Sequence, residues 1–133
     1  MIGILVITHG KFGEEMLKSA ESILGPQENT RFIHLPTGET IDILVNKLET
    51  TIKEIDQGEG VLILTDMLGG TPCNICLKVS KTNINIEIVS GLNLYMLLTA
   101  FVQRSKIGLK ELVTKVIESG RKNITNIKEI FLK

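Results

Sequence analysis

The sequence has few aromatic residues and no excess of charge of either sign. Of its 133 residues none is Trp and 4% are aromatic, so aliphatic side chains must fill the core. Lys plus Arg and Asp plus Glu each number 15, which gives a formal net charge of +0. Because a general nucleic-acid binder needs a basic surface to neutralise phosphates, we expect no nucleic-acid partner.

Long apolar runs, targeting segments and a cysteine framework are also missing. No apolar stretch approaches the roughly 20 residues of a membrane span. The apolar start of the chain is too short for a signal peptide and lacks both a basic leader and a cleavage pattern, so we expect a cytoplasmic protein. Cys73 and Cys76 are too few and too close together for a disulfide framework. The length suits a single domain over residues 1–133.

What the chain contains instead is a regular alternation of strand-like and helix-like segments. Apolar runs and alternations predict strands at 2–7, 31–35, 61–65 and 84–89, and a short last strand at 127–132. Apolar residues at three-to-four spacing predict helices at 12–24, 41–55, 72–79, 94–103 and 109–120. Such βαβ units imply a doubly wound α/β fold, in which a mainly parallel sheet carries helices on both faces. We expect the first four strands in the order 2-1-3-4.

Two strand ends carry residues suited to chemistry. His9 follows the first strand beside Gly10, and Asp66 follows the third strand. In the order 2-1-3-4 these strands are neighbours, about 4.8 Å apart, so the two side chains can touch. A carboxylate that accepts one ring N–H fixes the tautomer and leaves the other ring nitrogen free to attack an electrophile. The alternative is that His9 only caps a loop with a hydrogen bond.

A glycine-rich turn after the third strand suggests the electrophile. Gly69 and Gly70 let backbone amides approach a ligand closely, and Thr71 adds a hydroxyl donor. These residues lie at a predicted helix start, with Thr71 as the N-cap and Pro72 at the first helical position, where an anion such as phosphate is favoured. The alternative is an ordinary turn in which Thr71 only caps. Together with His9 and Asp66, the turn predicts a phosphohistidine.

Other interpretations use the same region of the chain. Cys73 and Cys76 form a C-x-x-C pair at a helix start, which fits a thiol-disulfide protein or two small buried residues on one helix face. The pair has no further cysteine or histidine partner for zinc, and we expect no metal or cofactor. Asp66 is also a candidate phospho-acceptor, but that chemistry needs an acidic cluster at the end of the first strand. We interpret His34 as solvated or structural.

The sequence resembles the IIA component of the mannose-family sugar phosphotransferase system. The matching stretches are 4–10, 60–74 and 89–93. The resemblance implies that His9 accepts a phosphoryl group on Nε2 from phospho-HPr and donates it to the IIB component. IIB then passes it to sugar entering through the IIC and IID membrane proteins. It also implies that Asp66 orients His9 and that Thr71 helps to hold the phosphate.

The resemblance further implies a homodimer, with the strand at 127–132 pairing antiparallel with the partner's sheet and covering its edge. We expect exposed apolar residues such as Met67, Leu68 and Leu92 to ring the site for partner docking. The sequence departs from the family at Ile7, where many members carry glycine. The IIA domain of a dihydroxyacetone kinase phosphotransfer system and a non-catalytic regulatory binding domain are further alternatives.

Overall fold

The protein is built on a parallel β-sheet, seen in a computed structural model that describes residues 1–36, 38–83 and 85–132. Within these residues the sheet has four strands in the order β2-β1-β3-β4, which confirms the predicted order. The strands are β1 (Gly3–His9), β2 (Thr30–Leu35), β3 (Val61–Thr65) and β4 (Ile86–Val89). The predicted start of the fourth strand at Ile84 lies outside the described residues.

The central strands β1 and β3 are buried on both faces, as their continuous apolar runs predict. Ile4 and Val6 pack into the core on one face of the sheet, and Leu5 and Ile7 pack into the core on the other. Ile7 lies opposite Thr65 in the register of the two strands. The strands therefore end side by side, at the carboxyl edge of the sheet.

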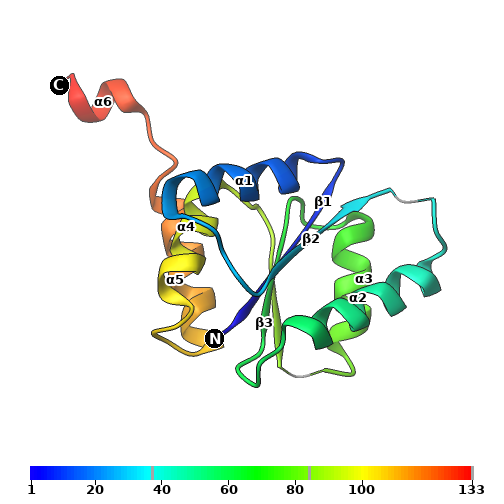
Figure 1. Cartoon of the computed structure of the whole chain (residues 1–133). Helices are drawn as coiled ribbons and strands as arrows, with labels where there is room; N and C mark the ends of the chain where they lie inside the picture. The colour runs from blue at the N-terminus through cyan, green and yellow to red at the C-terminus, as the bar shows by residue number, and fades with distance from the viewer. Residues whose placement is uncertain (37, 84, 133) are drawn as a thin grey trace.

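Helices cover both faces of the sheet and complete three layers (Figure 1). One face is covered by α1 (Phe12–Leu24), α4 (Leu94–Gln103) and α5 (Leu109–Lys122), and the other by α2 (Ile41–Ile55) and α3 (Gly70–Ser80). Thr40 caps α2, because its Oγ1 accepts a hydrogen bond from the N–H of Ile43 at 3.3 Å. In the described part of the chain, each helix is too short or too polar to cross a membrane.

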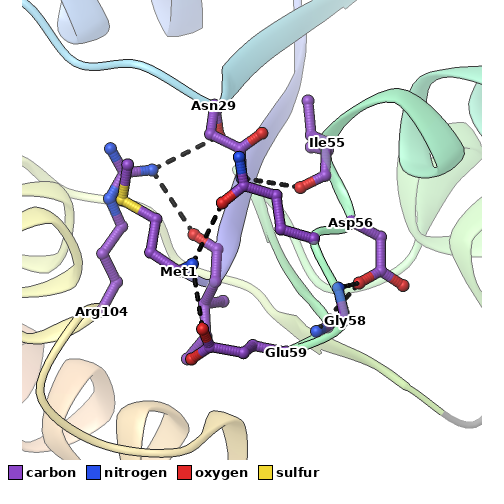
Figure 2. A network of polar contacts seen from close by, with 10 residues as sticks. Met1, Asn29, Ile55, Asp56, Gly58, Glu59 and Arg104 are labelled. Carbon is purple, nitrogen blue, oxygen red and sulfur yellow. Dashed lines mark hydrogen bonds and ion pairs between the residues drawn. The ribbon is translucent and has the colours of Figure 1, made fainter.

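A buried arginine holds the amino edge of the sheet (Figure 2). Arg104, which follows α4, is 2% exposed and donates to the carbonyl oxygens of Glu28 at 2.7 Å and Asn29 at 3.3 Å. Its guanidinium lies over the Phe101 ring, 5.2 Å from the ring centroid. The Asn29 side chain donates in turn to the carbonyl of Ile55 at 2.7 Å. These bonds connect the ends of α4 and α2 to the start of β2.

The predicted last strand is wrong, because α6 (Ile127–Phe131) is a helix. The apolar residues Ile127, Ile130 and Phe131 recur at three-to-four spacing, as on one face of a helix, and do not alternate as they would in a strand. The Asn126 side chain accepts a hydrogen bond from the N–H of Glu129 at 3.2 Å and caps the helix locally, whereas a strand needs a sheet edge to pair with. No residue of α6 is buried, and the helix extends away from the body of the protein (Figure 1).

Candidate functional site

The predicted contact between His9 and Asp66 is present at the carboxyl edge of the sheet. Nδ1 of His9 lies 2.8 Å from Oδ2 of Asp66, and the backbone N–H of His9 donates to the same oxygen at 3.0 Å. The backbone N–H of Met67 donates to the other carboxylate oxygen, Oδ1, at 3.0 Å. Three donors from two neighbouring strand ends therefore fix the carboxylate, and the carboxylate fixes the ring.

The electrostatics of the pair favour an ionised carboxylate. The side chain of Asp66 is 8% exposed and that of His9 is 44% exposed. Burial acts to raise the pKa of Asp66, but the hydrogen bonds from the His9 backbone, the His9 ring and the N–H groups of Asp66 and Met67 outweigh it and hold this pKa below its usual value. An ionised carboxylate can only accept hydrogen bonds, so Nδ1 carries the proton and the lone pair is on Nε2.

The free nitrogen of His9 faces the start of α3. A Cβ atom at Gly70 would lie 3.5 Å from Cε1 and 3.6 Å from Nε2 of the ring. Gly69 and Gly70 have φ values of 83° and 78°, a region that side chains other than glycine rarely adopt. The two glycines therefore turn the chain sharply and keep the space before Nε2 clear.

The helix begins earlier than predicted. α3 starts at Gly70 after Gly69, so Thr71 is not the N-cap and Pro72 is not the first helical residue. The positive φ values of the glycines turn the chain into the helix before Thr71, and Pro72 is still tolerated within the first turn. Among the residues that the structure describes, no side chain caps this helix start. Backbone N–H groups at a helix start without such a cap are an anion-binding feature.

A pocket of about 480 Å³ opens beside His9. It has a mainly apolar wall from the loop after β2 and from the start of α2, and its polar lining includes Thr71 from α3. The lining residues are His9, Leu35, Pro36, Gly38, Glu39, Ile41, Leu44 and Thr71. The contribution of the loop after β2 was not predicted from the sequence. Pro36 and Gly38, at the end of the strand next to β1, were the sequence signal for this loop.

The other predicted residues divide between surface and core. Met67 and Leu68 are exposed beside the site, but Leu92 is buried, so its predicted place on a docking surface is wrong. His34 stacks on Phe32 and lies 3.6 Å from the carboxylate of Glu14, which is consistent with a structural or solvated role.

The C-x-x-C pair belongs to α3. Cys73 is partly buried, and Cys76 is buried in the core with Ile75 and Val79. Burial, with a smaller contribution from the charge of Cys73, raises the pKa of Cys76 to about 12. Among the described residues no group of three or more His, Cys, Asp or Glu side chains could hold a metal ion.

Comparison with known proteins places this geometry in a family. Residues 3–117 match the EIIA-man family model, described as PTS system fructose IIA component. The chain is 34% identical over 128 residues to the PTS system mannose-specific EIIAB component of Escherichia coli (strain K12), a match that covers 96% of this chain and 40% of that protein. The chain therefore spans less than half the length of this relative.

Two further relatives are closer in length. The PTS system fructose-specific EIIA component of Bacillus subtilis (strain 168) is 29% identical over 116 residues, which cover 87% of this chain and 80% of that protein. Among solved structures, the crystal structure of phosphotransferase system component EIIA from Streptococcus agalactiae superposes on this protein with a TM-score of 0.87. The two sequences are 33% identical, and the match covers 97% of this chain and 99% of that chain. The chain therefore belongs to the EIIA-man family of phosphotransferase-system IIA components.

Proposed function

We propose that this protein carries a phosphoryl group on Nε2 of His9, between phospho-HPr and a IIB component. Membership of the family implies phosphoryl transfer in sugar uptake. The assignment of the phosphoryl group to Nε2 of His9 rests on the 2.8 Å contact between Nδ1 and Asp66, which leaves Nε2 as the free nucleophile. The side chain is partly exposed, so a partner protein can reach it.

In the proposed reaction the lone pair of Nε2 attacks the phosphorus atom of the donor's phosphohistidine. The bond between phosphorus and the donor nitrogen breaks, and its electron pair stays on the donor imidazole. His9 becomes a phosphorylated imidazolium while its Nδ1 proton remains hydrogen-bonded to Asp66, whose charge stabilises the cation. Transfer to IIB repeats the step with His9 as the leaving group.

The start of α3 is the proposed phosphate cradle. The incoming group carries negative charge towards the buried carboxylate of Asp66, so it needs compensating donors. Backbone N–H groups at the turn of Gly69 and Gly70 and the hydroxyl of Thr71 can supply them. The helix dipole adds a positive partial charge at the same end.

The test is phosphorylation of the purified chain by isotopically labelled phospho-HPr. We expect a label that is lost in acid and stable in base, as a phosphoramidate is, and that maps to His9. His9→Ala should abolish labelling, and His34→Ala, the matched control on β2, should leave it unchanged. Labelling of another residue, or an unchanged rate in His9→Ala, would contradict the proposal.

The proposed partners follow from the same site. HPr and IIB must cover the carboxyl edge of the sheet, where Phe12, Met67 and Leu68 are exposed. IIC and IID are reached indirectly, through IIB. We also propose that the chain is a single functional domain and that it forms a homodimer, since the exposed apolar residues of α6 gain from being covered by a second copy.

A further inference from the structure

Helix α3 carries two cysteines one turn after the proposed phosphate cradle. Cys73 is partly buried and therefore reachable from solvent, while Cys76 is 0% exposed and packs in the core. They are separated by three positions on one helix, and Gly70 precedes Cys73 by three positions on the same helix. The charge of Cys73 contributes to the raised pKa of Cys76, which is consistent with two neighbouring thiols.

We propose that Cys73 and Cys76 form a redox modification site, which a low-molecular-weight disulfide oxidises to an intrahelical disulfide that moves the start of α3 relative to His9. The effect on phosphoryl acceptance rests on the proposed function, whereas the thiol chemistry and the movement do not. Reduced cysteines have no part in the transfer itself.

The geometry of a helix explains why the disulfide must move the helix start. Side chains three positions apart have Cβ atoms about 5–6 Å apart, whereas a disulfide needs about 3.5–4.5 Å. Cys76 is fixed in the core, so the adjustment falls on Cys73 and on the turn that precedes it. A Cβ at Gly69 would meet no atom within 4 Å, so the space beside that glycine is open and leaves room for the turn to move.

A movement of the start of α3 would directly change the surroundings of Nε2 of His9. Gly70 begins α3, and a Cβ atom placed there would lie 3.5 Å from Cε1 and 3.6 Å from Nε2 of His9. A displacement of about 1 Å in a group that positions a reacting atom can cost on the order of 10²-fold in rate. We therefore expect oxidation to lower the rate of phosphoryl acceptance by about 10-fold to 10²-fold.

The oxidation takes place in two exchange steps. The thiolate of Cys73 attacks one sulfur of the low-molecular-weight disulfide, whose S–S bond breaks and releases one thiol after protonation. The thiolate of Cys76 then attacks the Cys73 sulfur of the mixed disulfide and releases the second thiol. Two protein thiols lose two electrons and two protons, and one small disulfide becomes two small thiols.

The second step should be slow and should depend on pH. With a pKa of about 12, Cys76 is a thiolate in a small fraction of molecules near neutral pH. This fraction rises about tenfold for each pH unit below the pKa, so ring closure should accelerate as the pH rises.

The experiment treats the full chain with glutathione disulfide and then follows three signals. Mass spectrometry should show the loss of two hydrogens in wild type, a trapped glutathione adduct in Cys76→Ser and no change in Cys73→Ser. The ring resonances of His9 should shift on oxidation, while those of His34, which lies on β2, should not. Acceptance from phospho-HPr should fall and should recover after reduction with dithiothreitol.

The controls separate this inference from the proposed function. Cys73→Ser/Cys76→Ser should accept phosphoryl groups at the wild-type rate with or without oxidant. If reduced wild type accepts none, the proposed function fails, while the mass and the His9 resonances still test the dithiol. A treated wild type that keeps both thiols free, or an internal disulfide with unshifted His9 resonances, would overturn the redox site. A disulfide that leaves acceptance unchanged would overturn the regulatory effect.

Discussion

At the scale of single residues, the carboxylate of Asp66 does two things. It accepts the backbone N–H of His9 as well as the ring nitrogen, so it joins the ends of β1 and β3 while it orients the imidazole. Because the group is nearly buried, its charge is weakly screened by water. The proposed chemistry and local folding therefore depend on the same ionised group.

Asp66→Asn should slow acceptance from phospho-HPr by on the order of 10²-fold, because the amide is neutral and holds the ring less well. Rapid-quench measurement of the labelled chain gives the rate. Asp56→Asn is the matched control, since Asp56 also accepts backbone N–H groups, from Gly58 and Gly60, but lies at the opposite edge (Figure 2). Equal rates in Asp66→Asn and wild type would refute the orienting role.

The depressed pKa of Asp66 predicts how stability depends on pH. A carboxyl whose folded pKa lies below its unfolded value of about 3.9 stabilises the protein above that value. This contribution is lost as the pH falls through the folded pKa. The free energy of unfolding should therefore fall more steeply below about pH 4 in wild type than in Asp66→Asn. Urea titrations at several pH values measure this difference, and parallel curves would argue against it.

Two threonines at strand ends predict opposite effects of the same substitution. Among the described residues, the hydroxyl of Thr65 is buried with no hydrogen-bond partner, whereas the hydroxyl of Thr8 accepts the N–H of Gly13 at 3.2 Å. Thr65→Val should raise the free energy of unfolding by about 1 kcal/mol, and Thr8→Val should lower it by about 1 kcal/mol. Urea denaturation of both variants provides the check, and a loss of stability in Thr65→Val would contradict it.

The contact between His9 and Asp66 could be predicted because it needs only the strand order and the position of each residue after its strand. The apolar wall beside His9 could not. It comes from the loop after β2 and from Ile41 at the start of α2, and it depends on how a chain segment folds over the sheet edge. No periodic pattern encodes that placement. Leu92 failed as a docking residue for a similar reason, since an apolar side chain near a site is equally suited to the core.

At the scale of elements, the start of α3 sets the geometry before Nε2. The start of α3 was predicted too late in the chain, because Thr-Pro is a common beginning of a helix. The two consecutive positive φ values at Gly69 and Gly70, which begin the helix earlier, cannot be recognised from the pattern of residues alone. The strand predicted at 127–132 was also wrong, because its apolar residues recur at three-to-four spacing and Asn126 caps the segment as a helix.

Gly70→Ala should impair both stability and transfer. Its φ of 78° strains an alanine by about 1 kcal/mol, and the new Cβ would lie against the His9 ring. The control is Gly25→Ala, at a φ of 90° where a Cβ meets no atom within 4 Å. We expect similar losses of stability in the two variants by urea denaturation, and slower phosphoryl acceptance in Gly70→Ala. Equal transfer rates would show that the glycine serves the fold alone.

At the scale of the whole molecule, the carboxyl and amino edges of the sheet carry different kinds of residues. The carboxyl edge carries the reactive pair and the pocket, and the amino edge carries the polar network around Arg104 (Figure 2). α6 belongs to neither edge, since it extends from the body with its apolar residues exposed. A helix of five residues has few internal hydrogen bonds, so its conformation depends on what it contacts.

The exposed apolar residues of α6 predict that charge introduced there weakens self-association. Phe131→Lys should shift the proposed dimer towards monomer in sedimentation velocity measurements, because it removes apolar surface that a second copy would cover. Lys128→Ala, on the same helix, should leave the distribution unchanged or favour the dimer. A wild-type protein that is monomeric at all concentrations would exclude the dimer itself.

The way in which Arg104 holds the amino edge has a consequence for how the sequence can change over time. Its guanidinium binds the main-chain oxygens of Glu28 and Asn29, and every amino acid supplies such an oxygen. Position 28 can therefore accept other amino acids without weakening this hydrogen bond, whereas no other amino acid can replace the arginine equally well. Mutational tolerance at this end of the protein should therefore be uneven: Arg104 and Asn29, whose side chains make the bonds, should be constrained, and position 28 should be more variable.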